Sequence, residues 1–151
     1  MTDNETTYDA RHALLDHNIF ITWKPEYNLG IPILDEQHRG IVSTINSLYY
    51  AIQYNFGRPM LQPIINTVRE YTHIHFKIEE DLLKENGFPG LEHHQGLHRE
   101  LTDTLFLASD TCLKDHDPEQ FLDFLKLWWI EHICVKDRSF LAYSTKNMDK
   151  A

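Results

Sequence analysis

Histidines at helical-turn spacing are the residues of this chain best suited to carry chemistry. Ten of the 151 residues are histidine. His75 and Glu79 are four residues apart, and His94 and His98 have the same spacing. On a helix this spacing places both side chains on one face, about one turn apart. Two such pairs on adjacent helices can converge on one point in a core.

The full set of candidate ligands comprises five imidazoles and two carboxylates: His38, His75, Glu79, His94, His98, His132 and Asp137. A single zinc ion takes four ligands, so this set suits two five- or six-coordinate ions that share bridging carboxylates. Imidazole combined with carboxylate is typical of iron rather than of copper(I) or calcium. Bridging two cations would also offset the desolvation cost of burying Glu79 or Asp137.

One pair in this set has a less favourable spacing. His132 and Asp137 lie ~140° apart on an ideal helix at ~100° per residue, so they converge only with suitable rotamers or a local helix distortion. We interpret the other five histidines as ordinary polar residues: His12, His17, His73, His93 and His116. Glu70 and His73 form one Glu-x-x-His unit, but ferritin-like di-iron sites need two such units and further glutamates.

Four segments with helical apolar periodicity must position these ligands. The apolar pattern predicts helices over residues 33–55, 60–86, 91–113 and 118–144, preceded by an arm without sustained periodicity. Gly57 and Pro59 mark the end of the first helix, and Gly87 marks the end of the second. Pro63 is expected in the first turn of the second helix, where its missing N–H costs little. Asp117, followed by proline, is a helix start signal.

The short links between these helices favour antiparallel neighbours. We therefore expect an all-α fold, an up-down-up-down antiparallel four-helix bundle with an N-terminal arm. The expected division is an arm over residues 1–22, a four-helix domain over residues 23–145 and a C-terminal tail over residues 146–151.

Composition excludes several classes of partner. Acidic residues outnumber basic ones 23 to 14, which gives a formal charge of −9 and argues against nucleic acid and anionic membrane surfaces. No apolar run approaches the ~20 residues that span a bilayer. The polar start of the chain is unlike a secretory leader. Two cysteines, Cys112 and Cys134, form no disulfide framework, so a cytoplasmic location is expected.

Five motifs, spread over about residues 23–140, carry a resemblance to a known family. They are Trp23-x-x-x-Tyr27-x-x-Gly30-Ile31, Leu34-Asp35-x-Gln37-His38, His75-Phe76-x-x-Glu79-Glu80, His94-x-x-x-His98 and Trp128-x-x-x-His132-Ile133-x-x-x-Asp137. With these motifs the chain resembles the hemerythrin family, specifically the single-domain bacteriohemerythrins. The resemblance implies two iron ions per chain, with a bridging oxygen from solvent, in a non-haem centre that binds O2 reversibly.

The resemblance also implies a role for each ligand. One iron would be held by three imidazoles, those of His94, His98 and His132, and the other by His38 and His75. Both irons would be bridged by Glu79 and Asp137. The second iron, with one imidazole fewer, would keep the open position at which dioxygen binds.

Apolar residues beside the ligands are expected to form a dry O2 pocket: Phe76, Trp128, Trp129 and Ile133. Trp129 and Trp128 should flank the iron face of the last helix. Family members commonly have leucine where this chain has Trp129, above the open iron. An indole there fills space and adds an N–H donor that needs a partner.

We therefore expect an O2-binding protein for oxygen storage, delivery or sensing, and not an enzyme. Two alternatives remain open. A di-iron oxidase or peroxidase could use the same ligands, although oxidases of the ferritin-like type favour carboxylate-rich sites. A signalling module could couple the state of the iron to a protein partner, for which the arm is the candidate effector segment.

Overall fold

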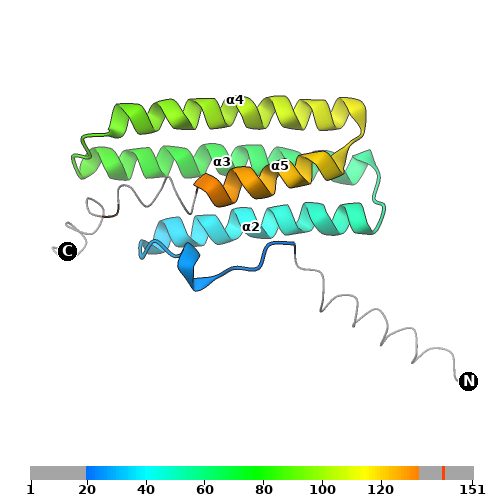
Figure 1. The fold of residues 1–151 in the computed structure, drawn as a ribbon, viewed down its shortest axis with the longest axis horizontal. Helices are drawn as coiled ribbons and strands as arrows, with labels where there is room; N and C mark the ends of the chain where they lie inside the picture. The colour runs from blue at the N-terminus through cyan, green and yellow to red at the C-terminus, as the bar shows by residue number, and fades with distance from the viewer. Residues whose placement is uncertain (1–19, 133–140, 142–151) are drawn as a thin grey trace, which may run out of the picture.

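The regular structure of the chain is helical throughout the part that the computed structural model describes, residues 20–132 and residue 141 (Figure 1). No strand occurs among these residues. A short 3-10 turn precedes four helices: η1 (Pro25–Tyr27), α2 (Pro32–Gln53), α3 (Arg58–Glu85), α4 (Leu91–Asp115) and α5 (Pro118–Glu131).

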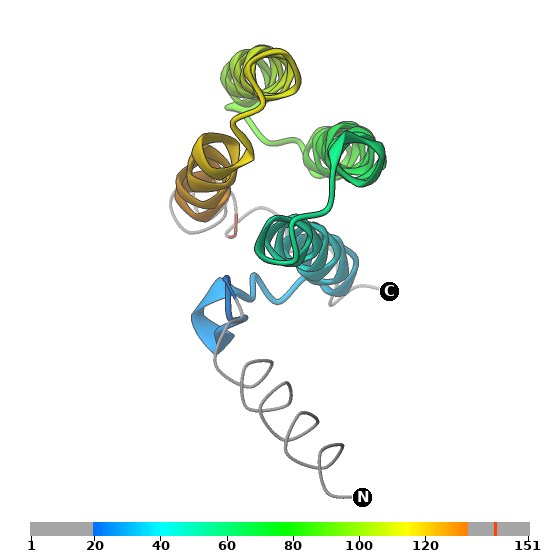
Figure 2. The ribbon, with the colours of Figure 1, turned by 90° about the vertical axis from the view of Figure 1, so that its right-hand side faces the viewer.

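The four helices close into a bundle. Helix α2 packs against α3 and α5, and α4 packs against the same two helices. Figure 1 shows consecutive helices joined at alternate ends, and Figure 2 shows the helices at the corners of a bundle seen end-on. Gly40 leaves room on α2 for the phenol of Tyr71 from α3, because a Cβ at this position would overlap it. The predicted up-down-up-down fold is confirmed.

Helix ends follow the local signals in most places. The Asp117 carboxylate caps α5 by accepting a hydrogen bond of 3.1 Å from the Gln120 N–H. Gly87 ends α3 with a positive φ of 66°, a conformation that glycine adopts without strain. The expected extension of the fourth helix to residue 144 lies outside the described residues.

The placement of Pro63 in a first turn was wrong. Helix α3 begins at Arg58, so Pro59 occupies the first turn and Pro63 lies inside the helix. Both prolines are exposed. Solvent can therefore hydrogen-bond the helix carbonyl that Pro63, without an N–H, leaves unpaired.

The segment before α2 is tied to that helix by side-chain hydrogen bonds. Ile21 and Asn46 exchange two bonds of 2.9 Å, one from each partner. Asp35 accepts bonds from the Leu29 N–H at 2.7 Å and the Gly30 N–H at 3.1 Å. Ile21 is buried in the main core although the expected boundary places it in the arm. The boundaries after residues 22 and 145 stay predictions.

Two apolar clusters fill the bundle. The larger one includes Ile41, Phe76 and Trp129, and the smaller one consists of Leu29, Ile31, Leu34 and Leu83. Along α2, His38 falls between Leu34 of the smaller cluster and Ile41 of the larger one. The chain thus places a polar layer between two apolar ones. No helix among the described residues is long and apolar enough to cross a membrane.

Candidate metal centre

Burial separates the expected ligands from the other histidines. Six of the seven lie within the described residues, and each is at most 3% exposed: His38, His75, Glu79, His94, His98 and His132. The described histidines that we interpreted as ordinary polar residues are all exposed: His73, His93 and His116. Asp137 and the pocket residue Ile133 lie outside the described residues, as do His12 and His17.

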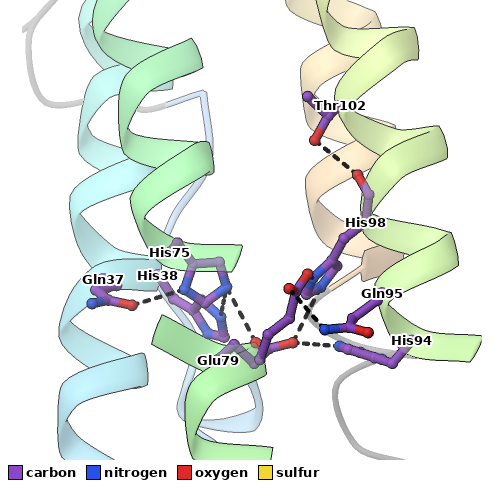
Figure 3. Close-up of polar contacts among 9 residues, drawn as sticks. Gln37, His38, His75, Glu79, His94, Gln95, His98 and Thr102 are labelled. Atoms are coloured by element: carbon purple, nitrogen blue, oxygen red, sulfur yellow. Dashed lines mark hydrogen bonds and ion pairs between the residues drawn. The ribbon is translucent and has the colours of Figure 1, made fainter. Parts of the chain in front are cut away.

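All four helices contribute to this layer. His38 comes from α2, the pair His75 and Glu79 from α3, and the pair His94 and His98 from α4. His132 follows α5 directly. Figure 3 shows the two helical pairs pointing toward one another across the bundle, as their four-residue spacing requires.

Glu79 is the centre of the layer. Its Oε1 lies 2.5 Å from His94 Nε2 and 3.3 Å from His98 Nε2, and its Oε2 lies 3.3 Å from His75 Nε2. His75 Nε2 in turn lies 3.1 Å from His38 Nε2. Two groups of three ligand atoms therefore share this one carboxylate, His38–His75–Glu79 and Glu79–His94–His98, and each group could hold a metal ion.

His132 lies beside the second of these groups. Its ring centroid is 5.2 Å from that of His98 and 6.2 Å from that of His94. His132 has helical backbone angles, and its N–H bonds to the carbonyls of Trp128 and Trp129. Asp137 lies outside the described residues, so its convergence with His132 stays a prediction.

The outer ring nitrogens of two histidines have oxygen partners on neighbouring helices. His75 Nδ1 lies 2.9 Å from Gln37 Oε1, and His98 Nδ1 lies 2.7 Å from Glu80 Oε1. A carbonyl or carboxylate oxygen only accepts hydrogen bonds, so each imidazole donates from Nδ1. The Nε2 atoms of both rings lie on the side of Glu79, each 3.3 Å from one of its oxygens.

This arrangement fits a cation better than it fits the protein atoms alone. His98 Nε2 and Glu79 Oε2 are both buried, and neither has a hydrogen-bond partner among the described residues. A buried polar atom without a partner is costly. Metal ions bound to these atoms would supply the missing partners, and the imidazole–carboxylate donor set suits iron.

The charge of Glu79 also favours a cation at this site. Burial alone would raise the pKa of this carboxyl, because a charge is poorly solvated inside the bundle. The imidazoles of His75, His94 and His98 outweigh burial and hold the pKa of Glu79 well below its usual range. Glu79 therefore carries a negative charge at the centre of the layer.

Aromatic side chains enclose the ligands. The Trp129 ring stands edge-on to His38 and His75, with centroids 5.3 and 5.8 Å away. Phe76 stacks on His98 at 3.8 Å. Trp128 stacks on Trp129 at 5.6 Å and lies 6.4 Å from His132. Trp129 is fully buried, and its indole N–H has no hydrogen-bond partner among the described residues.

Two residues of the site received no role from the sequence. Gln37 and Glu80 each neighbour a candidate ligand in the chain, yet each contacts a histidine on a different helix. The sequence feature that could have indicated them is their position next to a ligand within the ligand motifs. Only the packing of α2 on α3, and of α3 on α4, shows which imidazole each one meets.

A four-helix bundle with a buried layer of histidines around a shared carboxylate defines a class: the non-haem metal-binding four-helix proteins. Within this class, the family model for the hemerythrin HHE cation binding domain matches residues 29–143. The chain belongs to the hemerythrin family.

Individual relatives agree with this assignment. A bacteriohemerythrin from Stenotrophomonas maltophilia is 36% identical over 126 residues, which cover 80% of this chain and 78% of the relative. A bacteriohemerythrin from Clostridium acetobutylicum is 30% identical over 125 residues, 79% of this chain and 97% of the relative. The crystal structure of a leucine-to-tyrosine hemerythrin mutant has the same fold, with a TM-score of 0.75, 20% identity and coverage of 85% of this chain and 100% of that one.

The charge of Glu79 predicts a pH dependence in protein prepared without metal. Because its pKa is lowered, the ionised carboxylate contributes stability that is present above pH ~4.5 and is lost as the pH falls through the folded-state pKa. Glu79→Gln mimics the neutral form. The difference in unfolding free energy between parent and Glu79→Gln should therefore be largest above pH ~4.5 and shrink below it.

Urea unfolding followed by circular dichroism over a pH series measures this difference. Glu70→Gln, an exposed carboxylate change on the same helix, serves as the matched control and should follow the parent. A difference that stays constant from neutral to acid pH would contradict the lowered pKa.

Proposed function

We propose that this chain binds dioxygen reversibly at a di-iron centre in the buried histidine layer. The observation that carries the proposal is the position of Glu79, whose two oxygens serve two separate groups of imidazoles. One carboxylate between two ligand groups is the arrangement that a pair of bridged ions requires. Membership of a family defined by a cation-binding domain supports the same conclusion.

The proposed ligand assignment follows the two groups. His38 and His75 hold one iron, whereas His94, His98 and His132 hold the other. Glu79 bridges the pair, and Asp137 supplies the second bridge. When bound, the ferrous pair supplies the electrons with which dioxygen is held reversibly. The group with fewer imidazoles keeps the position where the gas enters.

The chain's own contribution at that position is to exclude water. Trp129 covers His38 and His75, and the Phe76 ring lies 5.8 Å from that of His75. Both side chains are buried. We assign Trp128 to the wall of the three-histidine half, where its ring lies 6.4 Å from that of His132 and 6.2 Å from that of Phe76. A dry pocket slows proton entry and the loss of reduced oxygen from the site.

We further propose that the protein is not an enzyme. The described ligands include five imidazoles and one carboxylate. This histidine-rich set differs from the carboxylate-rich sites of ferritin-like oxidases, which stabilise high-valent iron. An oxidase would consume O2 continuously in the presence of a reductant, whereas an O2 carrier would take up a fixed amount per centre.

The central experiment combines elemental analysis with visible absorption. The ferrous protein should contain two irons per chain and should develop a new visible band in air that disappears when oxygen is removed. Steady O2 uptake with excess reductant, or one metal per chain after expression with ample iron, would refute the proposal.

The second bridge is tested by substitution. Asp137→Ala removes a charge that both cations share, so we expect loss of at least one of the two irons and a lower melting temperature. His116→Ala, at an exposed position, is the matched control and should retain both irons. Equal iron content in the two variants would show that Asp137 is not a ligand.

Trp129→Leu tests the pocket. The smaller side chain removes no ligand, so iron content should stay near two per chain, at a packing cost of about 1–3 kcal/mol. The enlarged space beside His38 and His75 should change the rates of O2 release and autoxidation. Stopped-flow measurements that match the parent would show that Trp129 is ordinary core.

A further inference from the structure

We propose that Glu80 and Gln37 give the two irons of this centre different reduction potentials, with the lower potential on the iron held by His98. This inference rests on the proposed di-iron function and extends it to two residues that lie outside the ligand set. Each contacts the outer nitrogen of one ligand histidine, and the two differ in charge.

Glu80 is a charged partner held in place. Its Oε1 accepts a hydrogen bond from His98 Nδ1 at 2.7 Å, while its Oε2 accepts one from Gln95 Nε2 at 3.4 Å. The Glu80 side chain is only 21% exposed. Two contacts from α4 therefore fix a carboxylate of α3 beside the imidazole.

Gln37 is the neutral counterpart in the other half. Its Oε1 accepts a hydrogen bond from His75 Nδ1 at 2.9 Å. The same ring atom donates in both halves, to a carboxylate in one and to an amide in the other. The two halves thus differ in the charge of the acceptor more than in geometry.

This difference acts on the metal through the imidazole. A carboxylate that accepts the Nδ1 proton makes the ring a stronger electron donor at Nε2, and it adds a negative charge near the ion. Both effects stabilise Fe3+ relative to Fe2+, so they lower the potential at which the ion takes one electron from a chemical reductant. An amide has the weaker effect, which leaves the iron at His38 and His75 easier to keep ferrous.

The surroundings of Glu80 provide a matched control. Glu80 and Asp103 both line a surface groove of about 310 Å³ between α3 and α4. Asp103 is exposed. Its carboxylate carries the same charge at the same groove, so Asp103→Asn measures the effect of removing charge without removing the partner of His98.

The experiment compares three variants of the full-length iron-loaded protein: Glu80→Gln, Gln37→Glu and Asp103→Asn. Potentiometric titration with redox mediators should give a more positive midpoint potential for Glu80→Gln and a more negative one for Gln37→Glu. Asp103→Asn should match the parent. Competition with a ferrous chelator should show about 10- to 100-fold weaker iron retention for Glu80→Gln, the usual effect of losing such a partner.

Opposite shifts in the two site variants support the inference, because a merely structural role would not reverse the sign. Even if Glu80→Gln loads iron poorly, Gln37→Glu still tests whether a carboxylate at the outer nitrogen of a ligand histidine lowers the reduction potential. The inference would be overturned if Glu80→Gln and Gln37→Glu had the same midpoint potentials as the parent and Asp103→Asn. A parent protein that binds fewer than two irons would instead refute the proposed function, so the two failures are distinguishable.

Discussion

The structure depends on one buried charge. Glu79 is fully buried, yet the imidazoles around it keep its pKa low, so a negative charge lies at the centre of the bundle. A lone carboxylate in that position would be strongly destabilising. Its compensation requires positive charge at two points, because the two oxygens face different groups of histidines.

Around that charge the bundle is asymmetric in three respects. His132 adds an imidazole on one side only. Trp129 stands edge-on to His38 and His75, and its ring lies 6.2 Å from that of His132. The outer hydrogen bonds end on a carboxylate in one half and on an amide in the other. The two halves therefore differ in the number of imidazoles, in their aromatic neighbours and in the charge of the acceptors of the outer hydrogen bonds.

The arrangement also explains how a polar layer persists in an apolar core. Apolar clusters lie on both sides of it, and helices α2 and α3 pass through all three layers. Because the side chains of one helix face recur every three or four residues, the same face can supply Leu34, then His38, then Ile41. Aromatic rings contact the imidazoles face to face or edge to face.

The sequence by itself was sufficient for the bundle, for most helix ends and for the separation of buried from exposed histidines, because those depend on local periodicity and turn residues. It also gave the family. The placement of Pro63 failed because two prolines compete near one helix start and only Pro59 lies in the first turn. Asp137 and Ile133 remain predictions, as does the ligand assignment. The tertiary structure places Glu79 between two histidine groups, as the resemblance implies, and it alone decided that Gln37 meets His75 and that Glu80 meets His98. Those contacts join different helices, and the spacing within one helix does not determine the register between two.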